Sequence, residues 1–100
     1  MTNGVVVTFE ITLPSEMAEG FSRMGGEGLE ATKAFPGCRG VRIVQHKDDR
    51  CRFLFVEDWD SEDAYRAYIA WRTERGEFQA LQTMATRIET NIWPSLVAST

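Results

Sequence analysis

The stretch AYRAYIAWRTERGEF, residues 64–78, places aromatic and cationic side chains at helical spacing. With a rotation of about 100° per residue, one face of such a helix collects Tyr65, Tyr68, Ile69, Trp71, Arg72 and Arg75. Phenolic hydroxyl groups both donate and accept hydrogen bonds, and a guanidinium carries a permanent positive charge. This face is therefore a candidate wall of a site for an aromatic ligand that bears oxygen atoms.

Two interpretations of the arginines remain open. In the first, Arg72 presents its charge to an anionic oxygen of the ligand and so favours a phenolate over a phenol. Ground-state oxygen accepts an electron more readily from a phenolate or carbanion than from the neutral molecule, so such a ligand can act as its own reductant. In the second, Arg72 extends to solvent or pairs with Glu57 or Asp58. Arg75 then bonds the last carbonyl groups of its helix.

The stretch CRFLFVEDW, residues 51–59, adds candidates on one face of a strand. Alternate residues of an extended chain point the same way, so Phe55, Glu57 and Trp59 share a face. The Trp59 indole offers an N–H donor or a stacking surface. Glu57 is a candidate general base if burial raises its pKa, and pairing with a nearby arginine is the favoured alternative. The aromatic candidates on both stretches are also explained as core packing.

A helix is predicted from residue 15 to about residue 34, with Ser15 as its N-cap and Glu16 in its first turn. Its buried arc contains Met17, Phe21, Met24, Gly28, Ala31, Thr32 and Phe35. The segment MGGEG interrupts this helix, because each interior glycine lowers helix propensity by about 0.8–1 kcal/mol against alanine. We expect a kink or break that leaves room for a pocket beside Phe21, Met24 and Gly28. A phosphate-binding loop needs its glycines between a strand and the N-terminus of a helix. These glycines lie inside a helical pattern, which argues against such a loop.

The remaining reactive side chains form no recognisable catalytic or metal-binding pattern. His46 is the only histidine, and beside a predicted hairpin turn it is expected to be solvated. Cys38 and Cys51 lack CxxC or Cys/His spacing, so reduced, packed thiols are expected. Hydrolase and metalloenzyme chemistry are therefore disfavoured, and no metal or cofactor is predicted.

The elements that position these residues follow from periodicity and capping signals. They are a strand at 5–13, the helix at 15–34, a strand at 38–46, a hairpin turn at 47–50, a strand at 51–59, a helix from Asp60 or Ser61 to Arg75, a helical segment through Met84 and a strand at 86–93. Gly76 is placed to end the longer helix in the left-handed conformation. The order predicts a ferredoxin-like α+β fold, β-α-β-β-α-β, with helices on one face of a four-stranded antiparallel sheet.

Composition fits one domain over residues 1–100, since 43% hydrophobic residues supply a core. Leu54 and Val56 give the third strand a second apolar face, which predicts a homodimer through the sheet. The net charge of −4 disfavours nucleic acid and anionic membranes as partners. The start MTNGVVVTF has no basic region and alternates like a strand, so a cytoplasmic protein without a signal peptide is expected.

Two segments, FPGCRGVRIV and FLFVEDWDSEDAYRAY, resemble the antibiotic biosynthesis monooxygenase superfamily, the dimeric α+β barrels. The resemblance spans roughly residues 5–93. It implies two sheets packed face to face and a pocket in each subunit between the sheet and its own helices. In members that oxygenate polyketide phenols without a cofactor, Trp59 and Tyr65 match residues of the site. Phe55 stands where those members have an asparagine.

The haem-degrading branch of the same superfamily matches less well. It carries an asparagine on the first strand, a tryptophan in the second helix and a histidine ligand beyond it. The corresponding residues are Phe9, Tyr68 and Gln82, so the resemblance supplies no axial ligand for haem.

Together these features predict a homodimeric monooxygenase that uses O2 and no cofactor on an aromatic phenol, quinol or polyketide-like compound. A cyclase or isomerase of such a compound and a non-catalytic small-molecule-binding dimer remain alternatives. The predicted catalytic residues are Tyr68, Arg72, Trp59 and Tyr65. The predicted substrate-binding residues are Phe9, Phe21, Met24, Gly28, Phe55, Glu57 and Trp71.

Overall fold

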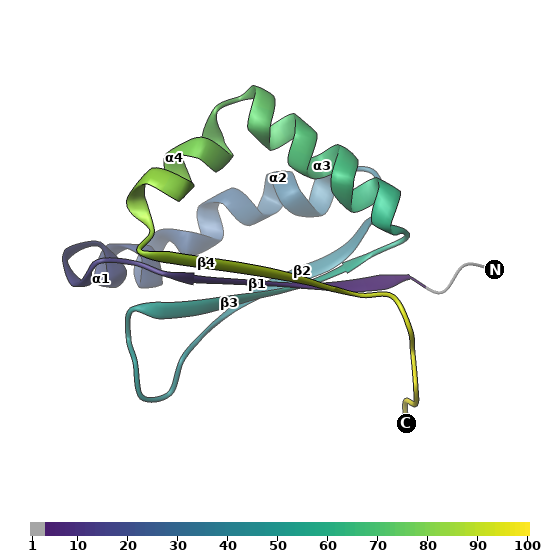
Figure 1. Ribbon diagram of the computed structural model, residues 1–100, viewed down its shortest axis with the longest axis horizontal. Coiled ribbons are helices and arrows are strands. Elements are labelled where there is room, and N and C mark those ends of the chain that lie inside the picture. Colours follow the sequence, from purple (N-terminus) through teal and green to yellow (C-terminus); the bar gives the residue numbers. More distant parts are fainter. Residues whose placement is uncertain (1–3) are drawn as a thin grey trace.

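A computed structural model describes residues 4–100 and has one layer of helices on one layer of sheet (Figure 1). The strands are β1 (Val5–Thr12), β2 (Cys38–Gln45), β3 (Arg52–Trp59) and β4 (Arg87–Trp93). The helices are α1 (Ser15–Met24), the 3₁₀ turn η1 (Gly25–Gly28), α2 (Leu29–Ala34), α3 (Glu62–Glu74) and α4 (Glu77–Met84). The sheet is antiparallel in the order β2-β3-β1-β4. The predicted ferredoxin-like α+β class is confirmed.

Side-chain alternation in β1 and β3 separates the two faces of the sheet. Val7 lies opposite Glu57 of β3, and the helix-facing side chains of Val7, Ile11 and Trp59 are fully buried. Figure 1 shows every labelled helix on this same side. The helix layer and the sheet therefore enclose the core between them.

The first helical region is broken where the glycines predicted a break. α1 ends at Met24, the 3₁₀ turn η1 follows, and α2 begins at Leu29. The expectation that Ser15 caps this helix is wrong. The extended residue before the helix is Pro14, whose carbonyl accepts the N–H groups of Met17 and Ala18, and no side chain caps the helix.

The start and end of α3 agree with the sequence. Ser61 is its N-cap, and the Ser61 hydroxyl accepts the N–H of Ala64 at 3.1 Å. Gly76 has φ of 76°, the left-handed conformation, and separates α3 from α4. These two signals set where α3 begins and ends.

The turn before β2 brings that strand close to the start of α3. Gly37 has φ of 93°, and a Cβ atom built there would lie 2.5 Å from Cβ of Ala64. The Gly37 carbonyl also accepts the N–H of Asp60 at 2.8 Å. A larger residue at position 37 would therefore push α3 away from the sheet.

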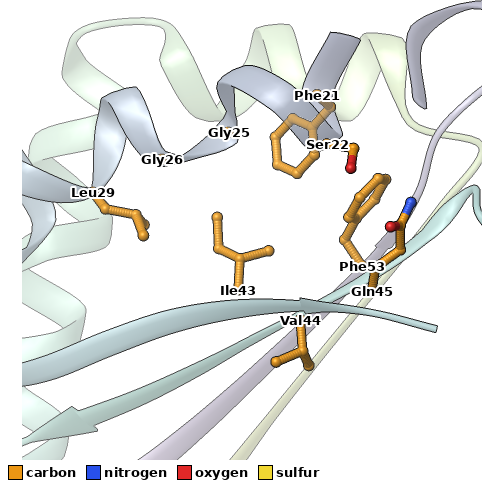
Figure 2. Close-up of a pocket in the computed structure, with 9 residues that line it drawn as sticks. All are labelled: Phe21, Ser22, Gly25, Gly26, Leu29, Ile43, Val44, Gln45 and Phe53. Atoms are coloured by element: carbon orange, nitrogen blue, oxygen red, sulfur yellow. The ribbon is translucent and has the colours of Figure 1, made fainter. Parts of the chain in front are cut away.

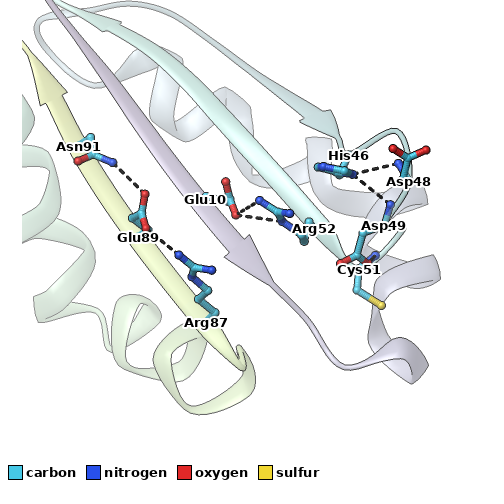
Figure 3. Close-up of polar contacts among 9 residues, drawn as sticks. All are labelled: Glu10, His46, Asp48, Asp49, Cys51, Arg52, Arg87, Glu89 and Asn91. Atoms are coloured by element: carbon cyan, nitrogen blue, oxygen red, sulfur yellow. Dashed lines mark hydrogen bonds and ion pairs between the residues drawn. The ribbon is translucent and has the colours of Figure 1, made fainter.

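No helix of the described chain covers the opposite face of the sheet, and this face is mostly polar. Arg52 pairs with Glu10 at 2.8 Å, and Glu89 accepts hydrogen bonds from Arg87 and Asn91 (Figure 3). Apolar side chains lie among these charged groups. They are Val6, Val44, Leu54, Val56 and Trp93. We call this surface, made by the outward side chains of the four strands, the open face.

Among residues 4–100, no helix is long and apolar enough to cross a membrane. The expectation about the chain start includes residues 1–3, which lie outside the described range.

Candidate functional site

A cavity of about 850 Å³ lies between the sheet and the helices. We call it the main cavity. It is lined from β1, β3 and all the helical segments, and most of the predicted site residues meet there. Those that line it are Phe9, Phe21, Met24, Gly28, Phe55, Glu57, Tyr65, Tyr68 and Arg72. The lining is mostly apolar, and its polar side chains are a group near Tyr68 and the carboxylates of Glu16 and Glu27.

Two predicted site residues do not line this cavity. Trp59 is fully buried and packs against Tyr65 and Tyr68, with ring centroids 5.9 and 5.0 Å away. Trp71 packs against Phe35 at 5.5 Å, outside the lining. The helical wheel grouped Trp71 with Tyr65 and Tyr68 because the arc was wide, whereas the cavity meets only part of that arc.

Several lining residues were absent from the predicted site. Thr32 was assigned only to the buried arc of its helix, and Phe78, Leu81 and Met84 only to the last helical segment. Their apolar spacing was visible in the sequence. The packing of α4 against α3 that brings them to the cavity was not.

A hydrogen-bond network surrounds the Tyr68 hydroxyl. Arg72 Nε donates to Tyr68 Oη at 2.9 Å, and Tyr68 Oη lies 2.8 Å from Thr32 Oγ1. Arg72 also donates to Thr32 Oγ1 at 3.1 Å, and the Thr32 hydroxyl donates to the Gly28 carbonyl at 3.4 Å. A guanidinium cannot accept hydrogen bonds, so Tyr68 accepts from Arg72. Because the one hydroxyl hydrogen of Thr32 goes to the Gly28 carbonyl, Tyr68 donates to Thr32. The network thereby sets the orientation of the phenolic hydroxyl.

The positive charge of Arg72 is matched within the chain. Its guanidinium forms an ion pair with Glu77, and Glu77 also pairs with Arg75. The hydrogen bond from Arg75, followed by that from Arg72, holds the pKa of Glu77 below its ordinary value. The suggested pairing of Arg72 with Glu57 or Asp58 is wrong, because the Glu77 carboxylate takes that position.

Arg75 has a different position from the one expected. Its guanidinium lies over the Trp71 ring, 4.9 Å from the centroid, and its side chain is exposed. It pairs with the Glu77 side chain, and no hydrogen bond to the last carbonyl groups of α3 is formed by this side chain within residues 4–100. Arg75 therefore lies outside the main cavity.

Glu57 is a buried carboxyl group on the sheet side of the cavity. It is 5% exposed, and Oε1 accepts the indole N–H of Trp59 at 2.9 Å. Burial raises the pKa of Glu57, while the Trp59 hydrogen bond and the charge of Arg72 act in the opposite direction. The favoured expectation of an ion pair with arginine is wrong for Glu57, which forms none within the described residues.

Tyr65 stays a neutral phenol beside this carboxyl group. Burial, and next the nearby charge of Glu57, raise the pKa of Tyr65. Tyr65 therefore offers an aromatic wall and not a base.

A smaller cavity of about 320 Å³ adjoins the main one on the β2 side. Figure 2 shows Phe21 and Leu29 pointing from the helices toward Ile43, whereas Val44 points to the other side of the strand. Phe21 and Gly25 border both cavities. The Phe21 ring packs edge-on against Phe53 at 4.7 Å and separates the two spaces.

The other reactive side chains lie away from the main cavity. His46 is exposed, and its Nδ1 accepts the N–H groups of Asp48 and Asp49 in the hairpin turn (Figure 3). Cys38 and Cys51 are free thiols. Within the described part of the chain, no cluster of side chains is suited to hold a metal ion.

Comparison with known proteins places this geometry in a family. Residues 4–83 match the family model described as antibiotic biosynthesis monooxygenase. No curated protein matches the chain significantly.

Solved structures match over nearly the whole chain at low identity. A Deinococcus radiodurans protein assigned to the antibiotic biosynthesis monooxygenases has a TM-score of 0.82, 18% identity and 96% coverage of both chains. Rv0793 from Mycobacterium tuberculosis has a TM-score of 0.81 and 14% identity, over 98% of this chain and 100% of that one. SnoaB, a cofactor-independent oxygenase from Streptomyces nogalater, has a TM-score of 0.80 and 15% identity, over 98% and 97%. At these identities the likenesses establish the fold, and the family model covers most of the sequence. The chain belongs to the antibiotic biosynthesis monooxygenase family.

Proposed function

We propose that this protein is a cofactor-independent monooxygenase that acts with O2 on an aromatic phenol, quinol or polyketide-like compound. The observation that carries the proposal is the main cavity, which is large and mostly apolar and presents hydrogen-bonding groups around Tyr68, Thr32 and Glu57. Such a lining suits a flat aromatic body with oxygen atoms at one end. Family membership supports oxygenation as the reaction.

The reaction we propose is the oxidation of an activated carbon next to the aromatic system. A proton leaves the substrate first, and the resulting carbanion or phenolate gives an electron to O2. When the activated carbon is a methylene group, that group and one O2 molecule become a carbonyl group and one water molecule. One oxygen atom therefore enters the product, and the other leaves as water with the two methylene hydrogens. The substrate supplies all the electrons, and no further reductant is required.

The site residues take different roles in this proposal. Tyr68 and Tyr65 line the space beside the ligand, and the Tyr68 hydroxyl can accept a further hydrogen bond from a ligand O–H. Arg72 is a positioning residue, since its donors are engaged by Tyr68, Thr32, Gly28 and Glu77. Trp59 and Trp71 support the wall from behind.

Oxygen uptake with a panel of quinols and anthrones tests the proposal. We expect turnover by the wild type and a decrease of at least about tenfold in Tyr68→Phe and Arg72→Leu. Arg75→Leu is the matched control, because it removes an arginine that pairs with the same Glu77 but does not line the cavity. Substrate consumption without oxygen would replace the proposal by a cyclase or isomerase. Quenching of tryptophan fluorescence by ligand, without turnover, would indicate a binding protein.

We also propose that the protein is a one-domain homodimer joined through the open face. Supporting observations are the exposed Trp93, which is 56% accessible, and the apolar side chains of Leu54 and Val56 on the same face. Charged pairs such as Arg52 and Glu10 would determine how the two copies align across such an interface. The free thiols Cys38 and Cys51 fit a reducing compartment such as the cytoplasm.

A further inference from the structure

The Glu57 carboxyl group is held in a fixed orientation at the main cavity. Its Oε1 atom accepts the Trp59 indole N–H at 2.9 Å. Trp59 is itself fully buried and packs between Phe35, Tyr65 and Tyr68. Because the indole cannot move, the carboxyl group is anchored through one oxygen.

The second oxygen of Glu57 is left for a ligand. This atom has no hydrogen-bond partner among residues 4–100. Every fully buried side-chain oxygen or nitrogen of the described chain has a partner, so this atom is not fully buried. It therefore retains access to the cavity that Glu57 lines. A carboxyl oxygen with no internal partner can exchange a proton with a bound molecule.

The groups around Glu57 favour this role. On the sheet, its neighbours in register are the apolar Val7 of β1 and Val41 of β2. The titratable groups near it are Tyr65 and Arg72 of α3 and the Cys38 thiol of β2.

Neither Arg72 nor Tyr65 competes for the proton. The guanidinium of Arg72 has no acceptor atom, and Tyr65 remains neutral. His46 lies at the hairpin turn and does not line the cavity.

We propose that Glu57 is the catalytic base of this site and takes the proton of the bound ligand through its cavity-facing oxygen. This inference rests on the proposed function. The ligand O–H or C–H bond breaks, its electron pair stays on the ligand, and a new O–H bond forms on Glu57. The product of the step is a phenolate or enolate beside a neutral carboxylic acid.

The same geometry defines the ligand class. The ligand is a flat compound with a weakly acidic O–H, or a C–H next to a carbonyl group, placed at the Glu57 end of the cavity. Ligands that are already anionic are disfavoured, because carboxylates of Glu16, Glu27 and Glu77 also line the cavity and Arg72 is neutralised by Glu77. Burial raises the pKa of Glu57, which makes its carboxylate a stronger base.

An anaerobic binding experiment with 1,8-dihydroxyanthrone tests the proton transfer without oxygen chemistry. Binding is followed by quenching of tryptophan fluorescence, and ionisation of the probe by its red-shifted absorption. We expect the wild type to bind and ionise the probe, with ionisation increasing as pH rises. Glu57→Gln should bind the probe with an affinity within about tenfold of that of the wild type. The fraction of bound probe that it ionises should be at least about 100-fold lower. Glu30→Gln, an exposed change on α2, should match the wild type.

The outcomes separate the two proposals. Equal ionisation by the wild type and Glu57→Gln, or binding without ionisation by the wild type, would overturn the role of Glu57. Ionisation that depends on Glu57 without any oxygen uptake would leave the base in place and overturn the monooxygenase proposal. Failure of the wild type to bind the probe would overturn both.

Discussion

At the scale of single residues, Arg72 is engaged inside the protein and not free for a ligand. Its donors reach Tyr68, Thr32, the Gly28 carbonyl and Glu77, so its charge organises one end of the cavity. The sequence placed Arg72 on the correct face of its helix. It did not reveal its partners, because Thr32 is 40 residues away along the chain and Glu77 lies across the Gly76 turn. Long-range contacts of this kind leave no periodic signal in a single sequence.

The Thr32 hydroxyl is the common partner of Tyr68 and Arg72, and its removal tests the network. Thr32→Val leaves the buried Tyr68 hydroxyl without its acceptor and removes one of the contacts of Arg72. We expect the free energy of unfolding to fall by about 1–3 kcal/mol, measured by urea denaturation. Thr32→Ser keeps the hydroxyl and should retain more stability than Thr32→Val. Equal stability of the two variants would show that the hydroxyl contributes nothing.

The buried carboxyl of Glu57 predicts a specific pH dependence of stability. Because burial raises the pKa of Glu57 in the folded state, its contribution to stability is complete below the pKa in the unfolded chain. That contribution is lost as pH rises through the folded-state pKa. Glu57→Gln lacks a titrating group at this position. Its free energy of unfolding should therefore increase relative to that of the wild type as the pH rises above the ordinary pKa of a glutamate side chain.

Urea denaturation at a series of pH values measures this difference. The exposed Glu30→Gln variant should follow the wild type at every pH. A constant difference between Glu57→Gln and the wild type over the same range would contradict the prediction.

At the scale of elements, capping decides how α1 and α3 begin. The two serines near the helix starts are Ser15 and Ser61, and only Ser61 accepts a backbone N–H with its side chain. Ser61→Ala should lower the free energy of unfolding by about 1 kcal/mol, whereas Ser15→Ala should change it little. Thermal or urea unfolding of both variants measures the contrast. Similar losses for the two serines would mean that the α3 cap is not stabilising.

The order and type of the elements were predictable because they depend on local signals. Alternating apolar residues identify β1 and β3, and Gly76 identifies the boundary between α3 and α4. The prediction of Ser15 as an N-cap was wrong because the extended residue before the first helical turn is Pro14. The Pro14 backbone carbonyl, and not a side chain, accepts N–H groups of that turn. The site was predicted less well, since which part of a helical face meets the cavity depends on how α3, α4 and the sheet pack.

At the scale of the whole molecule, the open face is where the proposed dimer forms. Leu54 is an apolar residue of β3 on this face, opposite Glu10 of β1. Leu54→Glu would bury an additional carboxylate at the interface, so we expect a monomer by analytical ultracentrifugation where the wild type is a dimer. Ala70→Glu, on the exposed side of α3, is the matched control and should remain dimeric. A Leu54→Glu protein that still sediments as a dimer would rule out this face.

The 3₁₀ turn η1 has a consequence for the protection of backbone amides from solvent. Its four residues, Gly25–Gly28, include three glycines, and neither Gly26 nor Gly28 has a neighbouring atom within 4 Å of a Cβ position. Hydrogen exchange reports local opening, which is easiest where few side chains pack. We expect the η1 amides to exchange sooner than those of β1 in mass spectrometry, and to slow when a ligand fills the main cavity. The helical turn whose amides exchange soonest would then also line the cavity that holds the ligand.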